Sequence, residues 1–293
     1  MSANSIVLVV GGTGAQGAAV VEELAKSPSY AIRILTRTAT SSTATRLSNL
    51  PNVKLFEGSA HHEPDIHQAL EGVDIVYCNT NGFAIGEKAE IYWGIRFFEL
   101  SREHNVKQFV SAQVSFQSLY GVLFNQHMKP VDIKPGSGAP PMIYLADLGR
   151  YARWLIENPE RSNGMNLKIA TEHLGYKDLA RTYTEITGRR AIFRDVTLDE
   201  YFDSGLFPTP DEKVGHSAEK DDETLQTYRQ NFTGFWNTWK EDVVVRDMKL
   251  LDEIMPDRVK SIGDWMKLCG YTGERSSVLK DYRDATMPKP GNS

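Results

Sequence analysis

The sequence is poor in cysteine and has no long hydrophobic run. Its two cysteines, Cys78 and Cys269, are far apart and are not spaced like metal ligands. The longest clean apolar stretch near the start, Ile6–Val10, is far too short to span a bilayer and lacks the basic flank and long apolar core of a secretory signal. We therefore expect a cytoplasmic protein with reduced thiols and no membrane association.

The chain also has no excess of positive charge. Its 33 Lys and Arg residues are outnumbered by 38 Asp and Glu residues, which gives a formal net charge of −5. A protein that binds nucleic acid through a general basic field needs the opposite balance, so we expect no direct nucleic-acid binding. With 293 residues, 41% of them hydrophobic, the chain can bury a large core in one or two domains without disulfides.

Several catalytic signatures are missing as well. The sequence has no Gly-x-Ser-x-Gly elbow and no Tyr-x-x-x-Lys pair, and Tyr92 with Arg96 gives only Tyr-x-x-x-Arg. One group of possible metal ligands occurs near residue 65: His61, His62, Glu63, Asp65 and His67. His62 and His67 are five residues apart, which does not place them on one helix face, and zinc sites use better-defined ligand sets. We expect no metal site, and interpret this group as the solvated start of a helix.

What the sequence does contain is an alternation of short apolar runs and amphipathic segments over its first 112 residues. Five runs are predicted to be strands: Ile6–Val10, Ala31–Thr36, Val53–Phe56, Val73–Tyr77 and Gln108–Ser111. Three segments between them are predicted to be helices: Ala15–Lys26, Asp65–Leu70 and Lys88–His104. Strands separated by helices imply right-handed crossovers. The pattern therefore predicts an α/β protein with a doubly wound parallel sheet covered on both faces.

The second half of the sequence is typical of a smaller, mostly helical cap domain. Helices are predicted over Asp147–Asn158, Lys177–Thr187, Thr227–Glu241 and Val259–Leu268, and a strand over Leu167–Ala170. We expect Asp147 to cap the first of these helices, Gly188 to end the second, and Thr197 with Glu200 to form a capping box before a further helix. The predicted divisions are residues 1–142 for the sheet domain, 143–286 for the cap region and 287–293 for a mobile tail.

The turn after the first predicted strand is rich in glycine. It reads Gly11-Gly12-Thr13-Gly14-Ala15-Gln16-Gly17 and leads directly into a predicted helix. In this order one glycine permits a tight turn, a second lets the backbone approach a diphosphate, and a third lets helix and strand pack closely. The free N–H groups at the start of the helix favour the diphosphate charge. We predict a dinucleotide site at Gly11–Gln16; the alternative is a glycine turn in a fold that has lost its ligand.

The ends of the other strands indicate how the dinucleotide would lie. Arg37, with Ser41 shortly after it, follows the second strand, where proteins that bind NAD place an acidic residue. A guanidinium pairs with a 2′-phosphate, which predicts NADP(H) in preference to NAD(H); an ordinary exposed arginine is the alternative. Gly58-Ser59 could border the adenine. Asn79-Thr80-Asn81 could line the nicotinamide ribose, or could be an ordinary polar turn.

These features resemble the NmrA-like family, atypical relatives of the short-chain dehydrogenases/reductases. The resemblance covers roughly residues 4–275 and rests on the following motifs: GGTGAQG, Thr36-Arg37, Val106–Val110, Leu145–Gly149, Asn158–Glu160 and Asp199–Tyr201. It implies an NADP-binding Rossmann domain in the first part of the chain, a smaller C-terminal domain, and cofactor contacts from the strand-end residues named above. The family includes transcriptional co-regulators that sense NADP(H), and oxidoreductases of secondary metabolism.

The chain departs from the family in its middle. Only 27 residues separate Ala112 from Pro140, where family members usually place a helix, a sixth strand and a substrate loop, and the helix often supplies a lysine. The catalytic residues are therefore unknown. Candidates that could hydrogen-bond a substrate or donate a proton are Tyr92, Gln113, His127 and Lys129. Each of them could equally be an ordinary polar or packing residue.

Three functions are compatible with these observations. An NADP(H)-dependent oxidoreductase would reduce a small aromatic or conjugated carbonyl substrate in a secondary-metabolite pathway. A non-catalytic NADP(H)-sensing regulator would bind a protein partner with an affinity that depends on the redox state of the cofactor. A degenerate chain would bind no nucleotide. We favour the oxidoreductase.

Overall fold

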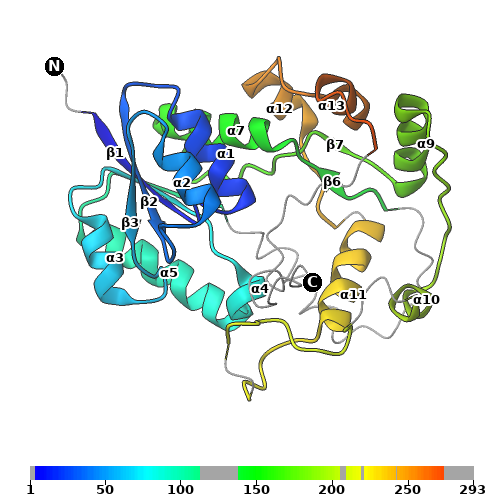
Figure 1. Ribbon diagram of the computed structural model, residues 1–293, viewed down its shortest axis with the longest axis horizontal. Coiled ribbons are helices and arrows are strands. Elements are labelled where there is room, and N and C mark those ends of the chain that lie inside the picture. Colours follow the sequence, from blue (N-terminus) through cyan, green and yellow to red (C-terminus); the bar gives the residue numbers. More distant parts are fainter. Residues whose placement is uncertain (1–3, 113–137, 205–208, 219–220, 242, 274–293) are drawn as a thin grey trace, which may run out of the picture.

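Five parallel strands form the central sheet of the computed structural model, which describes residues 4–112, 138–204, 209–218, 221–241 and 243–273. In sequence order they are β1 (Ser5–Val10), β2 (Tyr30–Thr36), β3 (Val53–Glu57), β4 (Ile75–Cys78) and β5 (Gln108–Ser111). Their spatial order is β3-β2-β1-β4-β5, and every neighbouring pair is parallel (Figure 1). The chain thus doubles back across β1, which confirms the predicted doubly wound sheet.

Both faces of the sheet are buried, because successive residues of a strand point to opposite sides. Val7 and Val9 lie in one core, and Leu8 and Val10 lie in the other. Helices α1 (Ala15–Leu24), α2 (Ser42–Ser48) and α7 (Leu145–Glu157) contribute to the first core. Helices α3 (Glu63–Leu70) and α5 (Glu87–Glu103) contribute to the second core. This two-sided burial explains why the strands are short continuous apolar runs.

Helix α7 packs directly on α1, although it lies after the sheet in the sequence. An added Cβ at Gly149 would come within 2.4 Å of the Ala19 carbonyl oxygen, so only glycine permits this approach. The predicted cap of this helix was wrong: α7 begins at Leu145, and Asp147 lies buried in its first turn. The Asp147 carboxylate accepts hydrogen bonds from Val259 N (2.8 Å) and Arg150 Nη1 (3.0 Å). The Asp147 side chain, which was expected to cap the helix, thus binds a residue more than 100 positions later in the sequence instead.

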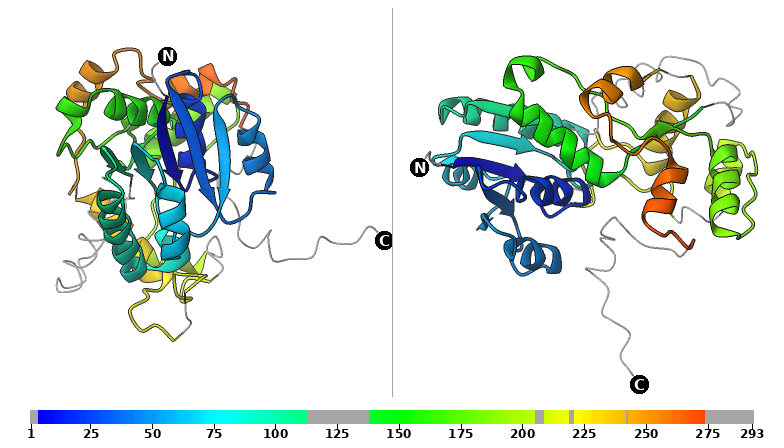
Figure 2. Two further views of the ribbon diagram at one scale, coloured as in Figure 1. Left: turned by 90° about the vertical axis from the view of Figure 1, so that its left-hand side faces the viewer. Right: turned by 90° about the horizontal axis from the view of Figure 1, so that it is seen from above.

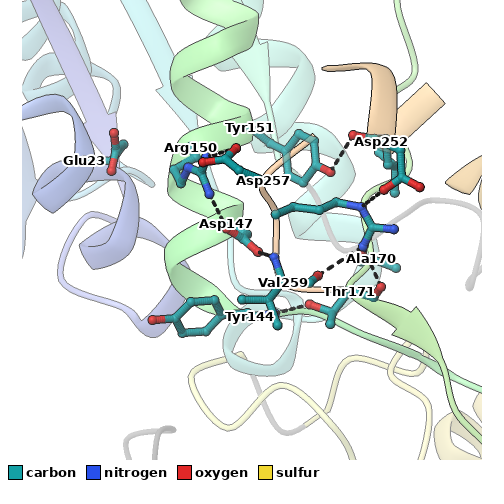
Figure 3. A network of polar contacts seen from close by, with 12 residues as sticks. Glu23, Tyr144, Asp147, Arg150, Tyr151, Ala170, Thr171, Asp252, Asp257 and Val259 are labelled. Atoms are coloured by element: carbon teal, nitrogen blue, oxygen red, sulfur yellow. Dashed lines mark hydrogen bonds and ion pairs between the residues drawn. The ribbon is translucent and has the colours of Figure 1, made fainter. Parts of the chain in front are cut away.

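The segment around Val259 is held against α7 by a network of buried polar contacts (Figure 3). Arg258 is only 6% exposed, and it donates to the Thr171 carbonyl oxygen (2.7 Å) and to Asp252 Oδ1 (2.9 Å). The Tyr151 hydroxyl of α7 donates to the Leu251 carbonyl oxygen (3.2 Å). Because a buried polar group without a partner is costly, this network fixes the C-terminal segment on α7 and on the chain around Thr171.

A small second sheet pairs β6 (Pro141–Met142) with β7 (Glu172–His173) in antiparallel fashion. The predicted strand Leu167–Ala170 was wrong, because the carbonyl oxygens of Ala170 and Thr171 accept hydrogen bonds from Arg258 rather than from a neighbouring strand. The predicted domain boundary at residue 142 falls at the end of β6.

The remaining helices lie mostly beyond the small sheet, away from β1–β5 (Figures 1 and 2). They are α4 (Gly82–Ile85), which follows β4 directly, α8 (Pro159–Ser162), α9 (Tyr176–Thr187), α10 (Leu198–Asp203), α11 (Tyr228–Lys240), α12 (Met248–Ile254) and α13 (Ile262–Leu268). The capping box of Thr197 with Glu200 and the left-handed Gly188 are confirmed. Helix α12 was not predicted from the sequence. Helix α13 begins three residues later than predicted, because Ser261 caps it. In the described ranges no helix combines the length and apolarity needed to cross a membrane.

Candidate functional site

The predicted binding residues gather at one edge of the sheet, beyond the carboxyl ends of four adjacent strands. Two backbone contacts show how the ends are joined: Gly58 N donates to the Thr36 carbonyl oxygen (2.9 Å), and Asn79 N donates to the Val10 carbonyl oxygen (3.2 Å). Parallel strands bring their carboxyl ends to the same edge, and ligands of doubly wound sheets bind there. The structure therefore places all four predicted groups around one crevice edge.

The glycine turn after β1 is as tight as its sequence predicts. Gly11 has φ +72°, and an added Cβ would lie 2.3 Å from the Asn79 carbonyl oxygen. An added Cβ at Gly17 would lie 2.2 Å from the Gly11 carbonyl oxygen. Gly14 occupies the N-cap position of α1 and supplies no side-chain acceptor to the first N–H groups of the helix. A closely wound turn that ends in uncapped amides suits a diphosphate group.

Arg37 lies exposed just beyond β2, and no carboxylate of the described residues pairs with it. Arg33, four residues earlier, is by contrast committed to the carbonyl oxygens of Ala69 (2.6 Å) and Glu71 (2.9 Å). The Arg37 guanidinium thus keeps its charge and its donors available for an anion. Ser41, also predicted at this site, uses its hydroxyl to cap α2, where it accepts a hydrogen bond from Ala44 N (3.3 Å).

The turn after β3 is organised by Asp65. Its carboxylate accepts a hydrogen bond from Ser59 N (2.7 Å) and pairs with His62 Nδ1 (2.9 Å), and these contacts hold the pKa of Asp65 below its usual range. His61 N donates to Ser59 Oγ (3.1 Å), and the His61 ring lies 5.8 Å from that of Trp93. His61 is half-buried and lies before α3, which starts at Glu63 after the exposed His62.

The turn after β4 rests on a buried carboxyl group that sequence reasoning missed. Glu90 of α5 is 8% exposed, and its Oε1 accepts a hydrogen bond from Thr80 Oγ1 (2.8 Å). Burial raises the pKa of Glu90, while hydrogen bonds from Thr80 and the Gly82 backbone oppose the rise. An added Cβ at Gly82 would come within 2.1 Å of Glu90 Oε2. An acidic residue in the first turn of a helix is common, so the sequence carried no signal for this role.

The catalytic candidates are only partly located. Tyr92 lies on the outer side of α5, is 55% exposed, and makes an edge-on ring contact with Trp93 (5.1 Å). Gln113, His127 and Lys129 lie outside the described residues, as does the predicted tail 287–293. Cys78 is no nucleophile at this edge, because burial and the nearby Glu90 raise the pKa of its thiol to about 12.

A cavity of about 1400 Å³ opens beside β5. Residues from both halves of the chain line it, among them Gln16, Ser111, Tyr151, Phe235 and Trp239. Gln16 belongs to the glycine turn and Ser111 ends β5, so the cavity adjoins the crevice edge. Phe235 and Trp239 both belong to α11, so this helix forms one wall of the cavity. The buried Trp239 Nε1 has no hydrogen-bond acceptor among the described residues.

Side chains of the histidine and acid group near residue 65 pair with one another or with His104. His62 pairs with Asp65, and His67 Nδ1 lies 2.9 Å from His104 Nε2. Within the described part of the chain, no group of three or more His, Cys, Asp or Glu side chains is arranged to hold a metal ion.

Comparison with known proteins agrees with this geometry. The model of the NmrA-like family matches residues 3–128. An NmrA-like family domain-containing protein of Dictyostelium discoideum is 34% identical over 108 residues, which is 37% of this chain and 35% of that protein. The match thus spans about a third of the relative's length.

Solved structures extend the likeness over nearly the whole chain. NmrA, a negative transcriptional regulator solved with NADP, has a TM-score of 0.64 at 15% identity, covering 92% of this chain and 98% of that one. The triphenylmethane reductase of Citrobacter sp., solved with NADP(H), has a TM-score of 0.56 at 14% identity, covering 89% and 99%. The resemblance to the NmrA-like family is therefore confirmed: the model of this family matches the part of the chain that carries the glycine turn, and the chain as a whole has the fold of NmrA and its reductase relatives.

Proposed function

We propose that the chain binds NADP(H) along the crevice edge and reduces a small aromatic or conjugated carbonyl compound. The observation that carries this proposal is the exposed Arg37, which has no described carboxylate partner and lies one strand away from the tight glycine turn. A carboxylate at this place would favour NAD, whereas a free guanidinium favours the extra phosphate of NADP. Relatives of the same fold were solved with NADP bound, which supports the assignment.

The cavity beside β5 supports the substrate class. Aromatic rings of Tyr151, Phe235 and Trp239 line it, and such walls suit a flat apolar molecule. The unpaired Trp239 Nε1–H could donate a hydrogen bond to a carbonyl oxygen of that molecule. A bound nicotinamide would supply the hydride, and the protein would orient the substrate and exclude water. A role in secondary metabolism and a cytoplasmic location stay predictions. The free thiols of Cys78 and Cys269 agree with such a location.

A fluorescence titration of the purified protein with NADPH and, in parallel, NADH tests the cofactor. We expect micromolar or tighter NADPH binding, and Arg37→Ala should weaken NADPH at least tenfold while leaving NADH nearly unchanged. Arg46→Ala is the matched control, because Arg46 is also exposed on the same side of the sheet but pairs with Glu22. Equal weakening of both nucleotides by Arg37→Ala would refute its role as the reader of the 2′-phosphate.

The second candidate function is an NADP(H) sensor that binds a protein partner. It is favoured by the lack of a Tyr-x-x-x-Lys pair in the sequence, because a reductase needs a proton donor beside the hydride donor and no such pair supplies one here. Substrate-dependent oxidation of NADPH by a panel of quinones and conjugated carbonyls separates the two functions. Tight NADPH binding without any turnover would favour the sensor, whose partner must then bind the NADP and NADPH forms with different affinity.

A further inference from the structure

Arg246 lies on the wall of the cavity beside β5, and no carboxylate of the described residues pairs with it. Its Nη1 donates to the Val244 carbonyl oxygen (3.2 Å), while its buried Nε has no described acceptor. The adjacent Asp247 caps α12 instead. Arg258 is also buried, but it pairs with Asp252 (2.9 Å). Burial lowers the pKa of the Arg246 guanidinium, because water is removed from the charge and no described acid replaces it.

The indole of Trp239 lies directly beside this guanidinium. Arg246 Cζ is 5.0 Å from the centroid of the Trp239 ring and lies over it, in a cation–π contact. Trp239 is 8% exposed, and its buried Nε1 has no acceptor among the described residues. Both side chains carry hydrogen-bond donors only, so neither can satisfy the other. One wall of the cavity therefore holds a positive charge and two N–H groups, Arg246 Nε and Trp239 Nε1, that need an acceptor.

This pair of side chains is held in place by its surroundings. The Trp239 ring makes an edge-on contact with that of Phe235, with 6.0 Å between the centroids. An added Cβ at Gly138 would lie 2.2 Å from the Trp239 carbonyl oxygen, so the chain before β6 passes closely over the end of α11. The Arg246 carbonyl oxygen accepts a hydrogen bond from Met248 N (3.1 Å), at the start of α12. Donors that are positioned before binding lose less entropy when a ligand arrives.

The charged side chains around the cavity are mostly basic, although the whole chain has a net charge of −5. Among the described residues the basic ones are Arg102, Lys107, Lys168 and Arg246, and the acidic one is Glu160. Lys107 pairs with Asp74 (2.7 Å), and Glu160 is exposed in the first turn of α8. A concave surface lined by an excess of one charge attracts ligands of the opposite charge. The lining therefore favours an anionic ligand.

We propose that the cavity binds a substrate that carries a carboxylate, and that Arg246 and the Trp239 N–H hold this group. The proposal rests on the reductase function proposed above and narrows its substrates to acidic aromatic compounds. A carboxylate supplies two acceptor oxygens and compensates the guanidinium charge, whereas water or a neutral carbonyl group supplies acceptors only. The acceptor for Trp239 Nε1 is then a carboxylate oxygen, and the group that is reduced lies elsewhere on the molecule. The same cavity reaches Gln16 of the glycine turn, so a molecule anchored at Arg246 can extend toward the crevice edge.

Titration calorimetry of the full chain, with and without NADP, tests the proposal with two probes. They are trans-cinnamate and its uncharged amide, cinnamamide, which share the ring and the double bond. We expect cinnamate to bind about tenfold or more tightly than cinnamamide, since its hydrogen bonds are assisted by charge. Neither probe has to react, so the result does not depend on turnover. Equal affinity of the two probes, or no binding of cinnamate, would overturn the proposal.

Variants assign the preference to the two side chains. Arg246→Gln keeps an N–H donor but loses the charge, so it should weaken cinnamate about tenfold and leave cinnamamide nearly unchanged. Arg246→Lys should retain part of the preference. Trp239→Phe keeps a ring but removes the N–H, and should weaken cinnamate about threefold or more. Trp236→Phe is the matched control, because Trp236 Nε1 is also buried without a described acceptor, yet Trp236 is not among the described residues that line the cavity.

A fluorescence titration with NADPH checks that each variant is folded and still binds the nucleotide. A preference for cinnamate that survives in Arg246→Gln, or that Trp236→Phe reduces as much as Trp239→Phe does, would overturn this proposal. Loss of the preference in Arg246→Gln, together with no turnover of any conjugated carbonyl by the wild type, would support the carboxylate site and overturn the reductase function instead.

Discussion

At the residue scale, Glu90 of α5 holds a carboxyl group in a buried position behind the turn after β4. Burial raises the pKa of its carboxyl above the value in the unfolded chain, so the folded state favours the protonated form. Its favourable contribution is then fully present below the unfolded pKa, near 4.5, and is lost as the pH rises through the raised folded value. We predict that the free energy of unfolding of the wild-type protein declines over this range.

The variant Glu90→Gln tests this prediction by urea unfolding between pH 4.5 and pH 8. A glutamine can still accept from the Gly82 backbone N–H and can donate to Thr80 Oγ1, so both hydrogen bonds survive without the charge. We expect the pH-dependent decline to be smaller in Glu90→Gln. Glu90→Ala, which removes both contacts, should be less stable than Glu90→Gln at every pH. Identical pH profiles of wild type and Glu90→Gln would contradict the assignment.

Gly11 tests how closely the glycine turn must be wound. Gly11→Ala places a methyl group against the Asn79 carbonyl oxygen and forces alanine into a left-handed conformation. Gly164→Ala is a matched control, since Gly164 has φ +73° but nothing lies within 4 Å of an added Cβ. We expect Gly164→Ala to cost about 1 kcal/mol of stability and to leave nucleotide binding intact. Gly11→Ala should cost more and should reduce NADPH affinity at least tenfold. Equal effects of the two variants would show that the close contact with Asn79 has no importance.

At the scale of elements, α7 is held by a carboxylate that the sequence suggested for another purpose. Asp147 is 2% exposed and accepts the Val259 N–H, so Asp147→Ala leaves that buried donor without a partner. We expect a loss of about 2 kcal/mol in the free energy of unfolding, measured by urea titration. Asp147→Asn keeps an acceptor for Val259 N but loses the charge opposite Arg150, so it should cost roughly half as much. A cost of Asp147→Asn as large as that of Asp147→Ala would show that the charge, and not the hydrogen bond to Val259, holds this joint.

The elements that were predicted correctly each depend on a local pattern. Strands β1 to β5 are buried on both faces and therefore appear as apolar runs, and the capping box at Thr197 is a contact between residues three apart. Two of the errors share one cause. Asp147 and the segment Leu167–Ala170 are both bound by residues about 90 to 110 positions later in the chain, Val259 and Arg258. A local sequence pattern gives no indication of a hydrogen-bond partner so far away in the chain.

At the scale of the whole molecule, the candidate site was likewise predictable only where it depends on local sequence. The shared location of Gly11, Arg37, Ser59 and Asn79 could be predicted from sequence, because each comes shortly after a predicted strand and the carboxyl ends of parallel strands meet. The place of His216 beside α4 could not be predicted in this way. This histidine lies in irregular chain of the second half, and its neighbours Gly215 and Ser217 are hydrogen-bonded to α4.

Whether the first half can exist alone is a further question at this scale. Residues 1–142 lack α7, whose Leu148, Ala152 and Ile156 share a core with Val21 and Leu24 of α1. We expect the fragment 1–142 to expose that core, bind hydrophobic dyes and show no cooperative thermal transition. A fragment 1–164, which retains α7, should bind less dye and show a more cooperative thermal transition. A fragment 1–142 that melts cooperatively would instead support the domain boundary predicted at residue 142.

Two main-chain hydrogen bonds, donated by Gly215 N and Ser217 N, join the loop that carries His216 to α4, and Gly215 has a left-handed backbone conformation. Main-chain hydrogen bonds do not depend on which side chain is present. The side chain at position 216 can therefore change during evolution while the path of the backbone along α4 stays the same.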